Sequence, residues 1–228
     1  MERELLKIFE GNSELFITTS LTGEVDERGK VQAKTLTVHA PITEQTWKEH
    51  LEGTTRIGIK PEKDDKCKWG CIDIDPHNYK GYNQKKIVDI IKEYNLPLVP
   101  ARSKSGGLHL FVFLDNWYPV KNVIKKLHEW NNAFFQAQEV FPMNKCLNMP
   151  YFNMNATTEF AYTDNNTPVM IGTFLEIVKK KTLSLESLEK IKVKDYEPES
   201  DWKHYPPCCR KMISEKWSGN HRNDLLFN

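Results

Sequence analysis

The stretch Trp69-Gly70-Cys71-Ile72-Asp73-Ile74-Asp75 most constrains what this chain can fold into. Apolar and small residues lead into two carboxylates separated by one isoleucine, which is the pattern of a buried strand that ends in acid. Alternate side chains of a strand share a face, so Asp73 and Asp75 point the same way, with Cα atoms about 6–7 Å apart. Like charges at that spacing are best tolerated when a divalent cation lies between them. The alternative is a strand that runs out into the polar turn Pro76-His77-Asn78.

The composition is that of an ordinary globular protein. The chain has 228 residues, is 39% hydrophobic and 28% charged, and carries a formal net charge of +1. That length allows one large domain or two small ones. Because the net charge is near zero, a nucleic-acid surface would have to be a local patch. No apolar run is long enough to span a membrane, so we expect no membrane partner.

The cysteines point to a reducing compartment. The 5 cysteines are an odd number without disulfide spacing, and we recognise no signal peptide, so a cytoplasmic location is expected. Zinc binding by Cys67 and Cys71, together with His77 or with Cys208 and Cys209, is one alternative. However, Cys71 lies inside the predicted strand, and no second ligand pair has finger-like spacing. We therefore expect no structural zinc.

From Trp69 onward the pattern predicts strand, helix, strand, strand, helix, strand. The acidic strand is followed by a helix at 83–94, strands at 96–101 and 108–114, a helix from Pro119, and a strand at 139–141. This order is typical of the split βαβ arrangement of ferredoxin-like and RNA-recognition-motif (RRM) folds. In that sheet the first and third strands lie side by side at the centre, which brings the turn at 102–107 close to the carboxylates.

The rest of the chain predicts an α+β protein with an N-terminal α/β module, residues 1–66, packed on the RRM-like module, residues 69–178. In the first module we expect helices at 1–10 and 43–51, strands at 15–17, 33–39 and 56–59, an exposed turn at 23–30 and a loop at 60–68. A strand and short helix at 169–178 and a helix at 184–191 close a core of residues 1–191. We expect residues 192–207 to be a linker and residues 208–228 to be the start of a new helical module that is cut short.

A second constellation is Arg102-Ser103-Lys104-Ser105-Gly106-Gly107-Leu108-His109. Gly106 and Gly107 let the backbone approach a ligand and expose its amides. Ser105 supplies a hydroxyl, Arg102 and Lys104 supply positive charge, and the His109 imidazole can donate to a phosphate oxygen. These groups suit a triphosphate, although no Walker-type sequence is present. The alternative is a solvated hairpin turn with an incidental histidine.

Glu139 is a candidate third carboxylate. It begins the last strand of the series, within a stretch that is otherwise apolar or amide. Three acids on neighbouring strands suit two divalent ions about 3.5–4 Å apart, one activating a 3′-hydroxyl and the other holding a triphosphate. The alternative is a surface glutamate on an edge strand.

The ordered triple of Asp73-Ile74-Asp75, Ser105-Gly106-Gly107-Leu108-His109 and Glu139-Val140-Phe141-Pro142 resembles the three motifs of archaeo-eukaryotic primases. The resemblance is strongest to the primase-polymerases of phages and mobile elements, and it covers roughly residues 10–178. Further similarity lies in Gly29-Lys30-Val31, residues 47–51 before Gly53, Ile57-Gly58-Ile59 and residues 148–152. Residues 206–227, with Gly219 and Arg222-Asn223, resemble the start of a helical primase C-terminal module that often links to a helicase.

The resemblance implies a template-directed nucleotidyltransferase, a DNA primase or DNA polymerase that extends a 3′-hydroxyl with Mg²⁺ or Mn²⁺ in phage or mobile-element replication. Asp73, Asp75 and Glu139 would bind two metal ions. Ser105 and His109 would hold the triphosphate, helped by Arg102 or Lys104 and by the Gly106-Gly107 backbone. The implied partners are a single-stranded DNA template, a primer, NTP or dNTP, and a helicase module, in the cytoplasm of a bacterial or archaeal host.

One departure concerns the basic residue after the third motif. Relatives often carry a lysine shortly after Phe-Pro, where this chain has Met143-Asn144, and Lys145 is the candidate substitute.

Two other functions fit the same residues. A catalytically degenerate RRM-like module would bind single strands through aromatic residues on its central strands. A metal-dependent nuclease would use the clustered acids without needing a triphosphate cradle.

Overall fold

The computed structural model describes residues 1–25, 31–79 and 81–192. These residues belong to one compact unit that mixes helices with antiparallel sheets, which is the predicted α+β class. Lys30, almost all of the predicted linker at 192–207 and the predicted helical segment at 208–228 lie outside the described residues. Within the described part of the chain, no helix is long and apolar enough to cross a membrane.

Three strands from the N-terminal residues and one short strand from residues 147–148 form a sheet of strand order β2-β1-β3-β8. Its elements are α1 (Glu2–Ile8), β1 (Phe16–Val25), β2 (Val31–Val38), α2 (Glu44–Leu51), β3 (Arg56–Ile59) and β8 (Leu147–Asn148). Helix α2 begins where predicted, because the Thr43 and Thr46 side chains cap each other's backbone N–H groups. β1 is much longer than the predicted strand at 15–17 and includes Gly23, which we placed in a turn. The pairing with β2 stops at Leu21 and resumes at Val25 after a shift in register, so Gly23 lies in an irregular part of this strand.

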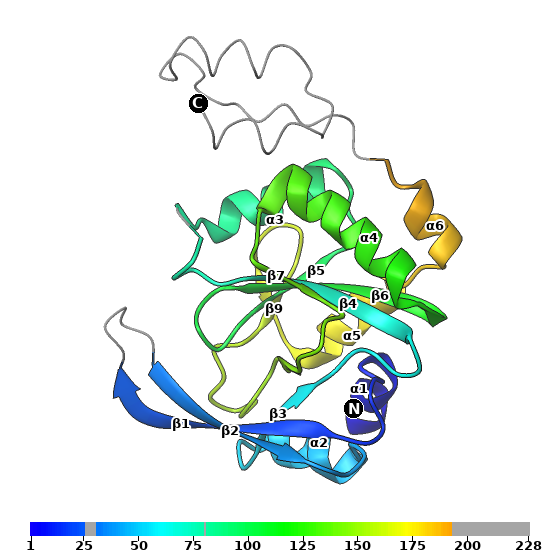
Figure 1. Ribbon diagram of the computed structural model, residues 1–228. Helices are drawn as coiled ribbons and strands as arrows, with labels where there is room; N and C mark the ends of the chain where they lie inside the picture. The colour runs from blue at the N-terminus through cyan, green and yellow to red at the C-terminus, as the bar shows by residue number, and fades with distance from the viewer. Residues whose placement is uncertain (26–30, 80, 193–228) are drawn as a thin grey trace, which may run out of the picture. The chain divides into compact units, whose positions relative to one another are not determined.

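The second sheet has the order β10-β9-β5-β6-β4-β7. Its strands are β4 (Lys66–Ile74), β5 (Val99–Arg102), β6 (Leu108–Pro119), β7 (Glu139–Phe141), β9 (Ala161–Tyr162) and β10 (Pro168–Val169). As predicted, β4 and β6 lie side by side between β5 and β7. Helices α3 (Gln84–Glu93) and α4 (Val120–Trp130) cover one face of this sheet (Figure 1). A π-helix, η1 (Asn131–Phe135), continues α4 toward β7.

Each of the two helices packs one row of apolar side chains against this face of the sheet. Helix α3 buries Ile87, Val88 and Ile91, and α4 buries a stripe that includes Leu127. Gly70 on β4 permits the close approach of α4, because a Cβ there would lie 2.6 Å from Leu127 Cδ1 and 2.8 Å from the Phe141 carbonyl oxygen. Helix α4 and strand β7 therefore leave no room for a side chain at this point of β4.

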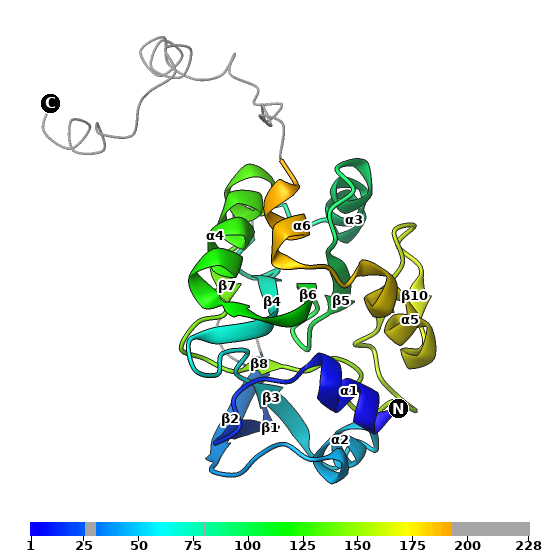
Figure 2. The same cartoon turned by 90° about the vertical axis from the view of Figure 1, so that its right-hand side faces the viewer.

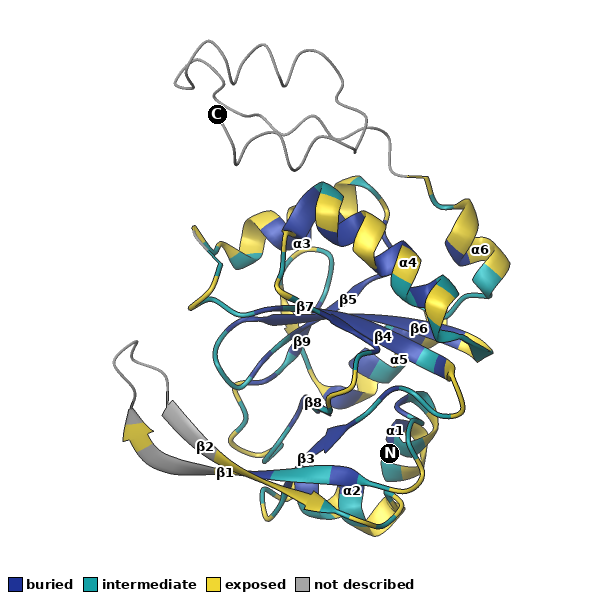
Figure 3. Cartoon of the chain, in the orientation of Figure 1, coloured by how far each residue is buried: buried dark blue, intermediate teal, exposed yellow. Residues whose placement is uncertain are grey.

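The opposite face packs against the N-terminal residues around Phe9. The Phe9 ring lies 5.5 Å from Trp69 on β4, and 5.2 and 5.4 Å from Phe111 and Phe113 on β6, between ring centroids. These side chains are buried in a core shared by both sheets, and Figure 3 shows β4 and β6 coloured mostly as buried. Aromatic contacts of this kind are worth about 0.5–1.5 kcal/mol each beyond the area they bury. The aromatic residues of the central strands are thus covered by the protein itself.

The last two helices of the described residues are α5 (Ile171–Lys181) and α6 (Leu185–Lys190) (Figure 2). Helix α5 is longer than the short helix predicted before residue 178. Its last turn is held by Lys181, whose ammonium donates to the Leu98 carbonyl and to the Asp164 carboxylate. Ser184 caps α6 by accepting from the Ser187 N–H, and Asn122 of α4 donates to Glu189 of α6.

His50 ties α2 to the rest of the molecule. The Ile57 N–H donates to its Nδ1 at 3.2 Å, so the other nitrogen, Nε2, carries the proton that is donated to the Pro150 carbonyl at 2.9 Å. The ring is fully buried, and this burial lowers the pKa of His50 from 6.5 to about 4. The folded protein therefore holds a neutral imidazole over a pH range in which an unfolded chain would protonate it.

We expect this histidine to make the protein sensitive to mild acid. Between pH 6.5 and 4 the unfolded chain binds a proton at His50 that the folded protein does not, so stability falls as the pH falls. The loss from this residue is about 3 kcal/mol, from a shift of this size. In His50→Gln that loss disappears, so the difference in unfolding free energy between wild type and variant should shrink on going from pH 7 to pH 4. Urea unfolding at several pH values measures it, and a difference that does not change with pH would contradict it.

Candidate active site

The sheet register brings the predicted acids and the histidine together. Asp73 of β4 is the direct partner of His109 on β6 and of Glu139 on β7. Residues directly opposite each other in antiparallel strands point to the same face, with Cβ atoms about 4.5–5.5 Å apart. Asp75 follows two residues later and accepts the His77 N–H at 3.1 Å. Asp73, His109 and Glu139 thus form one row across three neighbouring strands, and Asp75, the second acid of the predicted pair, follows Asp73 along the chain.

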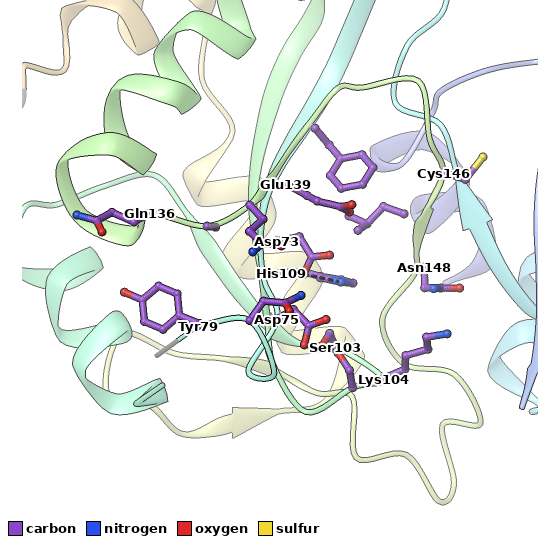
Figure 4. A pocket seen from close by; sticks show the side chains of 16 residues that line it. Asp73, Asp75, Tyr79, Ser103, Lys104, His109, Gln136, Glu139, Cys146 and Asn148 are labelled. Atoms are coloured by element: carbon purple, nitrogen blue, oxygen red, sulfur yellow. Dashed lines mark hydrogen bonds and ion pairs between the residues drawn. The ribbon is translucent and has the colours of Figure 1, made fainter. Parts of the chain in front are cut away.

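These residues border a cavity of about 250 Å³ (Figure 4). Of the predicted site residues, the cavity is lined by Asp73, Asp75, Lys104, Ser105, His109 and Glu139. Arg102, Gly106 and Gly107 do not line it. The structure therefore gathers all three predicted metal ligands and half of the predicted triphosphate ligands at one place.

The predicted glycine turn is held from within by Ser103. Its buried hydroxyl accepts the Gly107 N–H at 3.1 Å and lies 3.0 Å from the Ser105 hydroxyl. Its backbone N–H donates to the Gly107 carbonyl at 2.9 Å, and its carbonyl accepts the Gly106 N–H at 3.0 Å. Gly106 has φ +86°, a conformation that side chains other than glycine rarely adopt. These contacts form a tight turn that presents Lys104 and Ser105 at the cavity.

Arg102 is placed differently from the other basic residue of the turn. It pairs with Leu108 in the β5–β6 ladder, one residue away from the pair of Ala101 and His109. Because the side-chain period of a strand is two, Arg102 starts from the opposite face of the sheet to His109. Its contact with a triphosphate stays a prediction.

His109 is a buried and neutral histidine. Burial lowers the pKa of His109 from 6.5 to about 4. Its Nε2 lies 3.6 Å from Asp73 Oδ1, and its buried Nδ1 has no hydrogen-bond partner among the described residues. A buried polar atom without a partner is uncommon in folded proteins and is expected to be satisfied by a ligand or water.

Glu139 is engaged by the basic residue that follows the third motif. Lys145 donates to the Glu139 carboxylate, and this hydrogen bond, together with the charges of Glu139 and Asp73, raises the pKa of Lys145. Among the described residues, no set of three or more His, Cys, Asp or Glu side chains is already arranged around one point as a metal site. The oxygen donors present nevertheless have the chemistry that Mg²⁺ and Mn²⁺ prefer. The Lys145 ammonium is a positive charge already in contact with the Glu139 carboxylate.

Several cavity residues were not predicted from sequence: Asn78, Tyr79, Ser103, Gln136, Gln138, Cys146 and Asn148. Asn148 lies in the segment following the third motif, but nothing local indicates that its amide oxygen accepts the hydroxyl of Thr19 on β1 at 3.0 Å. The N-terminal sheet thus contributes to the cavity through this pair. Tyr79 and Gln136 lie in loops, where no periodic pattern indicates which way a side chain points.

The cysteines do not form a thiolate cluster within the described part of the chain. Cys67 and Cys71 are buried, and burial raises the pKa of Cys67 to about 12. Cys146 lines the cavity, and burial also raises its pKa. Burial raises the pKa of Cys71 as well, so all three thiols are held in the protonated form at neutral pH.

One family model matches the chain, that of the archaeo-eukaryotic primase domain of TOTE conflict systems, over residues 18–144. The match covers more than half of the chain and runs from β1 to just beyond β7. It includes the Asp73 row, the glycine turn and Glu139. Among curated proteins, none matches this chain.

We expect the glycine turn to be intolerant of a side chain at Gly107. A Cβ there would collide with the Ile74 carbonyl oxygen and lie 2.7 Å from Pro76 Cδ, next to Asp75. Gly107→Ala should cost about 2 kcal/mol or more, because backbone atoms cannot yield as a flexible side chain can. Chemical denaturation measures this. Gly172→Ala is the matched control, since a Cβ at this helical position meets nothing within 4 Å and should be neutral or stabilising by up to about 1 kcal/mol. Equal effects of the two changes would contradict the expectation.

Proposed function

Because this chain belongs to the archaeo-eukaryotic primase domains of TOTE conflict systems, we propose that it is a template-directed nucleotidyltransferase that adds nucleotides to a 3′-hydroxyl. The observation that carries the proposal is the placement of Asp73 opposite both His109 and Glu139 at the edge of one cavity. Membership of this family supports an activity of the primase or nucleotidyltransferase type. A role in phage replication stays a prediction.

The proposed reaction has a simple balance. The 3′-oxygen forms a bond to the α-phosphorus of the incoming nucleotide, and the hydroxyl proton passes to solvent. The bond from the α-phosphorus to its bridging oxygen breaks, and pyrophosphate leaves with the electron pair. Mg²⁺ or Mn²⁺, bound by Asp73, Asp75 and Glu139, would supply charge neutralisation at the attacking and leaving oxygens.

The other groups of the cavity bind and orient. The turn at Ser103 to Gly107 offers the Ser105 hydroxyl and the Lys104 ammonium to phosphate oxygens. His109 is neutral, so it can donate one hydrogen bond to a phosphate oxygen without adding a charge. Catalysis of this kind consists mainly of positioning, with no covalent enzyme intermediate.

We also propose that β4–α3–β5–β6–α4–β7 is an RRM-like catalytic unit. The observed neighbours, with β4 and β6 between β5 and β7, support this. The proposed partners are a single-stranded DNA template, a primer and NTP or dNTP, together with a helicase module in a longer protein.

One observation weighs against a pure binding module of RNA-recognition type. Such modules stack bases on exposed aromatic residues of the central strands. Here Trp69 and Phe111 are 0% exposed and Phe113 is 2% exposed, because the N-terminal residues cover them. A face that is already packed offers no stacking platform.

Primer extension tests the proposal directly. Wild type should extend a labelled primer on a single-stranded template with Mn²⁺ or Mg²⁺, and the nucleotide set that supports extension gives the sugar preference. Asp73→Asn with Asp75→Asn keeps the side-chain volumes and removes both charges, so extension should fall at least about 100-fold. Asp89→Asn, on the exposed side of α3, is the matched control and should leave extension unchanged. A wild type that shortens the primer would point to the nuclease instead, and one that binds template without extending it would point to the binding module.

Removing Lys145 should strengthen metal binding. In Lys145→Met the ammonium that occupies Glu139 is gone, so a divalent cation no longer competes with it for this carboxylate. The dissociation constant for Mn²⁺ should fall several-fold, because an ion pair between an ammonium and a partly exposed carboxylate is worth about 1 kcal/mol and must be broken before Mn²⁺ can bind. Electron paramagnetic resonance of free Mn²⁺ measures it without any activity assay. Weaker Mn²⁺ binding in this variant would contradict the expectation.

A further inference from the structure

The cavity has two chemically different ends. Figure 4 shows Lys104, Ser103 and Asn148 on one side of the acids, and Tyr79 and Gln136 on the other. Asp73, Asp75 and Glu139 lie between them. The first end carries an ammonium and hydroxyls, which suit phosphate oxygens. The second end offers an aromatic ring and an uncharged carboxamide, which suit a nucleoside.

In-line displacement gives this arrangement a direction. The attacking oxygen and the leaving oxygen lie on opposite sides of the phosphorus that is transferred. If the triphosphate occupies the end with Lys104 and Ser105, pyrophosphate departs toward that end. The 3′-hydroxyl must then approach from the other side of the acids, which is where Tyr79 and Gln136 are found.

The backbone of Gln136 is held in place by a specific local structure, and its side chain is exposed. It follows the π-helix η1 in a left-handed conformation, φ 50°, which is unusual for a residue other than glycine. The buried side chain of Asn131 holds this turn, since it donates to the Ala137 carbonyl at 2.9 Å and accepts the Ala137 N–H at 2.8 Å. The Gln136 N–H also donates to the Asn131 carbonyl at 2.6 Å. π-helical turns and strained residues occur preferentially at functional sites.

Tyr79 is positioned by the turn that follows the acids. The Asn78 N–H donates to the Asp75 carbonyl at 3.1 Å, and the Tyr82 N–H donates to the Tyr79 carbonyl at 3.2 Å. The turn therefore starts from a metal-ligand candidate and places a half-buried aromatic ring four residues later at the cavity. Base stacking on an exposed aromatic ring is worth about 1–3 kcal/mol and is tolerant of base identity.

We propose that Tyr79 and Gln136 form the acceptor subsite, which binds the 3′-terminal nucleoside of the primer. Tyr79 stacks on this nucleoside, Gln136 hydrogen-bonds to it, and Asn131 is a positioning residue for Gln136. The proposal rests on the nucleotidyltransferase function. It assigns the primer terminus to the end of the cavity that the triphosphate does not occupy.

The test separates primer binding from nucleotide binding. Tyr79→Ala should raise the KM for primer–template about 10-fold and leave the KM for nucleotide unchanged, as expected for one lost stacking contact. Tyr79→Phe should behave as wild type, because the ring carries the contact. Gln136→Ala should also raise the primer KM, and Asn131→Ala should reproduce its effect. Tyr118→Ala is the matched control, since Tyr118 pairs with Cys67 at the far end of the same ladder from Asp73.

A binding measurement keeps the two proposals distinguishable. Fluorescence anisotropy of a labelled duplex with a recessed 3′ end, without nucleotide, should show about 10-fold weaker binding for Tyr79→Ala than for wild type. If wild type binds this duplex without extending it, the nucleotidyltransferase proposal fails, whatever the variants do. If wild type extends primers and Tyr79→Ala raises the nucleotide KM instead, or changes neither KM, the acceptor subsite is wrong. An equal effect of Tyr118→Ala would also overturn it.

Discussion

The cavity depends on the register of β4 with two neighbours at once. Because β4 pairs with β6 on one side and β7 on the other, Asp73 faces both His109 and Glu139. The next row, Ile74 with Leu108, is fully buried on the face covered by helices. A slip of one residue would place carboxylates beneath those helices and isoleucine in the cavity. Burial of the apolar rows therefore fixes the register of β4, and this register places the acids at the cavity.

The other face of the sheet shows how the protein separates its core from its site. Along β4 and β6 the side chains of Trp69, Phe111 and Phe113 are enclosed by the N-terminal residues around Phe9. The end of this face, from Asp73 onward, borders the cavity instead. The N-terminal sheet also reaches the cavity itself, since Thr19 orients Asn148. Closing the core and completing the site are thus two results of one packing arrangement.

Charge is distributed unevenly around the acids. His109 is kept neutral by burial, while Lys145 neutralises Glu139 at the rim. Lys104 lies toward one end of the cavity and the uncharged pair of Tyr79 and Gln136 toward the other. A nucleotide carries its negative charge at the phosphates and none at the nucleoside, so under the proposed function this asymmetry would give a nucleotide and a primer strand different ends to occupy.

Local signals in the sequence determined the elements and the nature of the chemistry. The capping Thr43, the acidic end of β4 and the turn before His109 were all predicted, because each depends on residues close together in the chain. Only the tertiary structure decided that Tyr79 and Gln136 share a cavity with these acids and that Asn148 is oriented from the N-terminal sheet. Those placements depend on loop conformations and on pairings between distant residues, which no local pattern encodes.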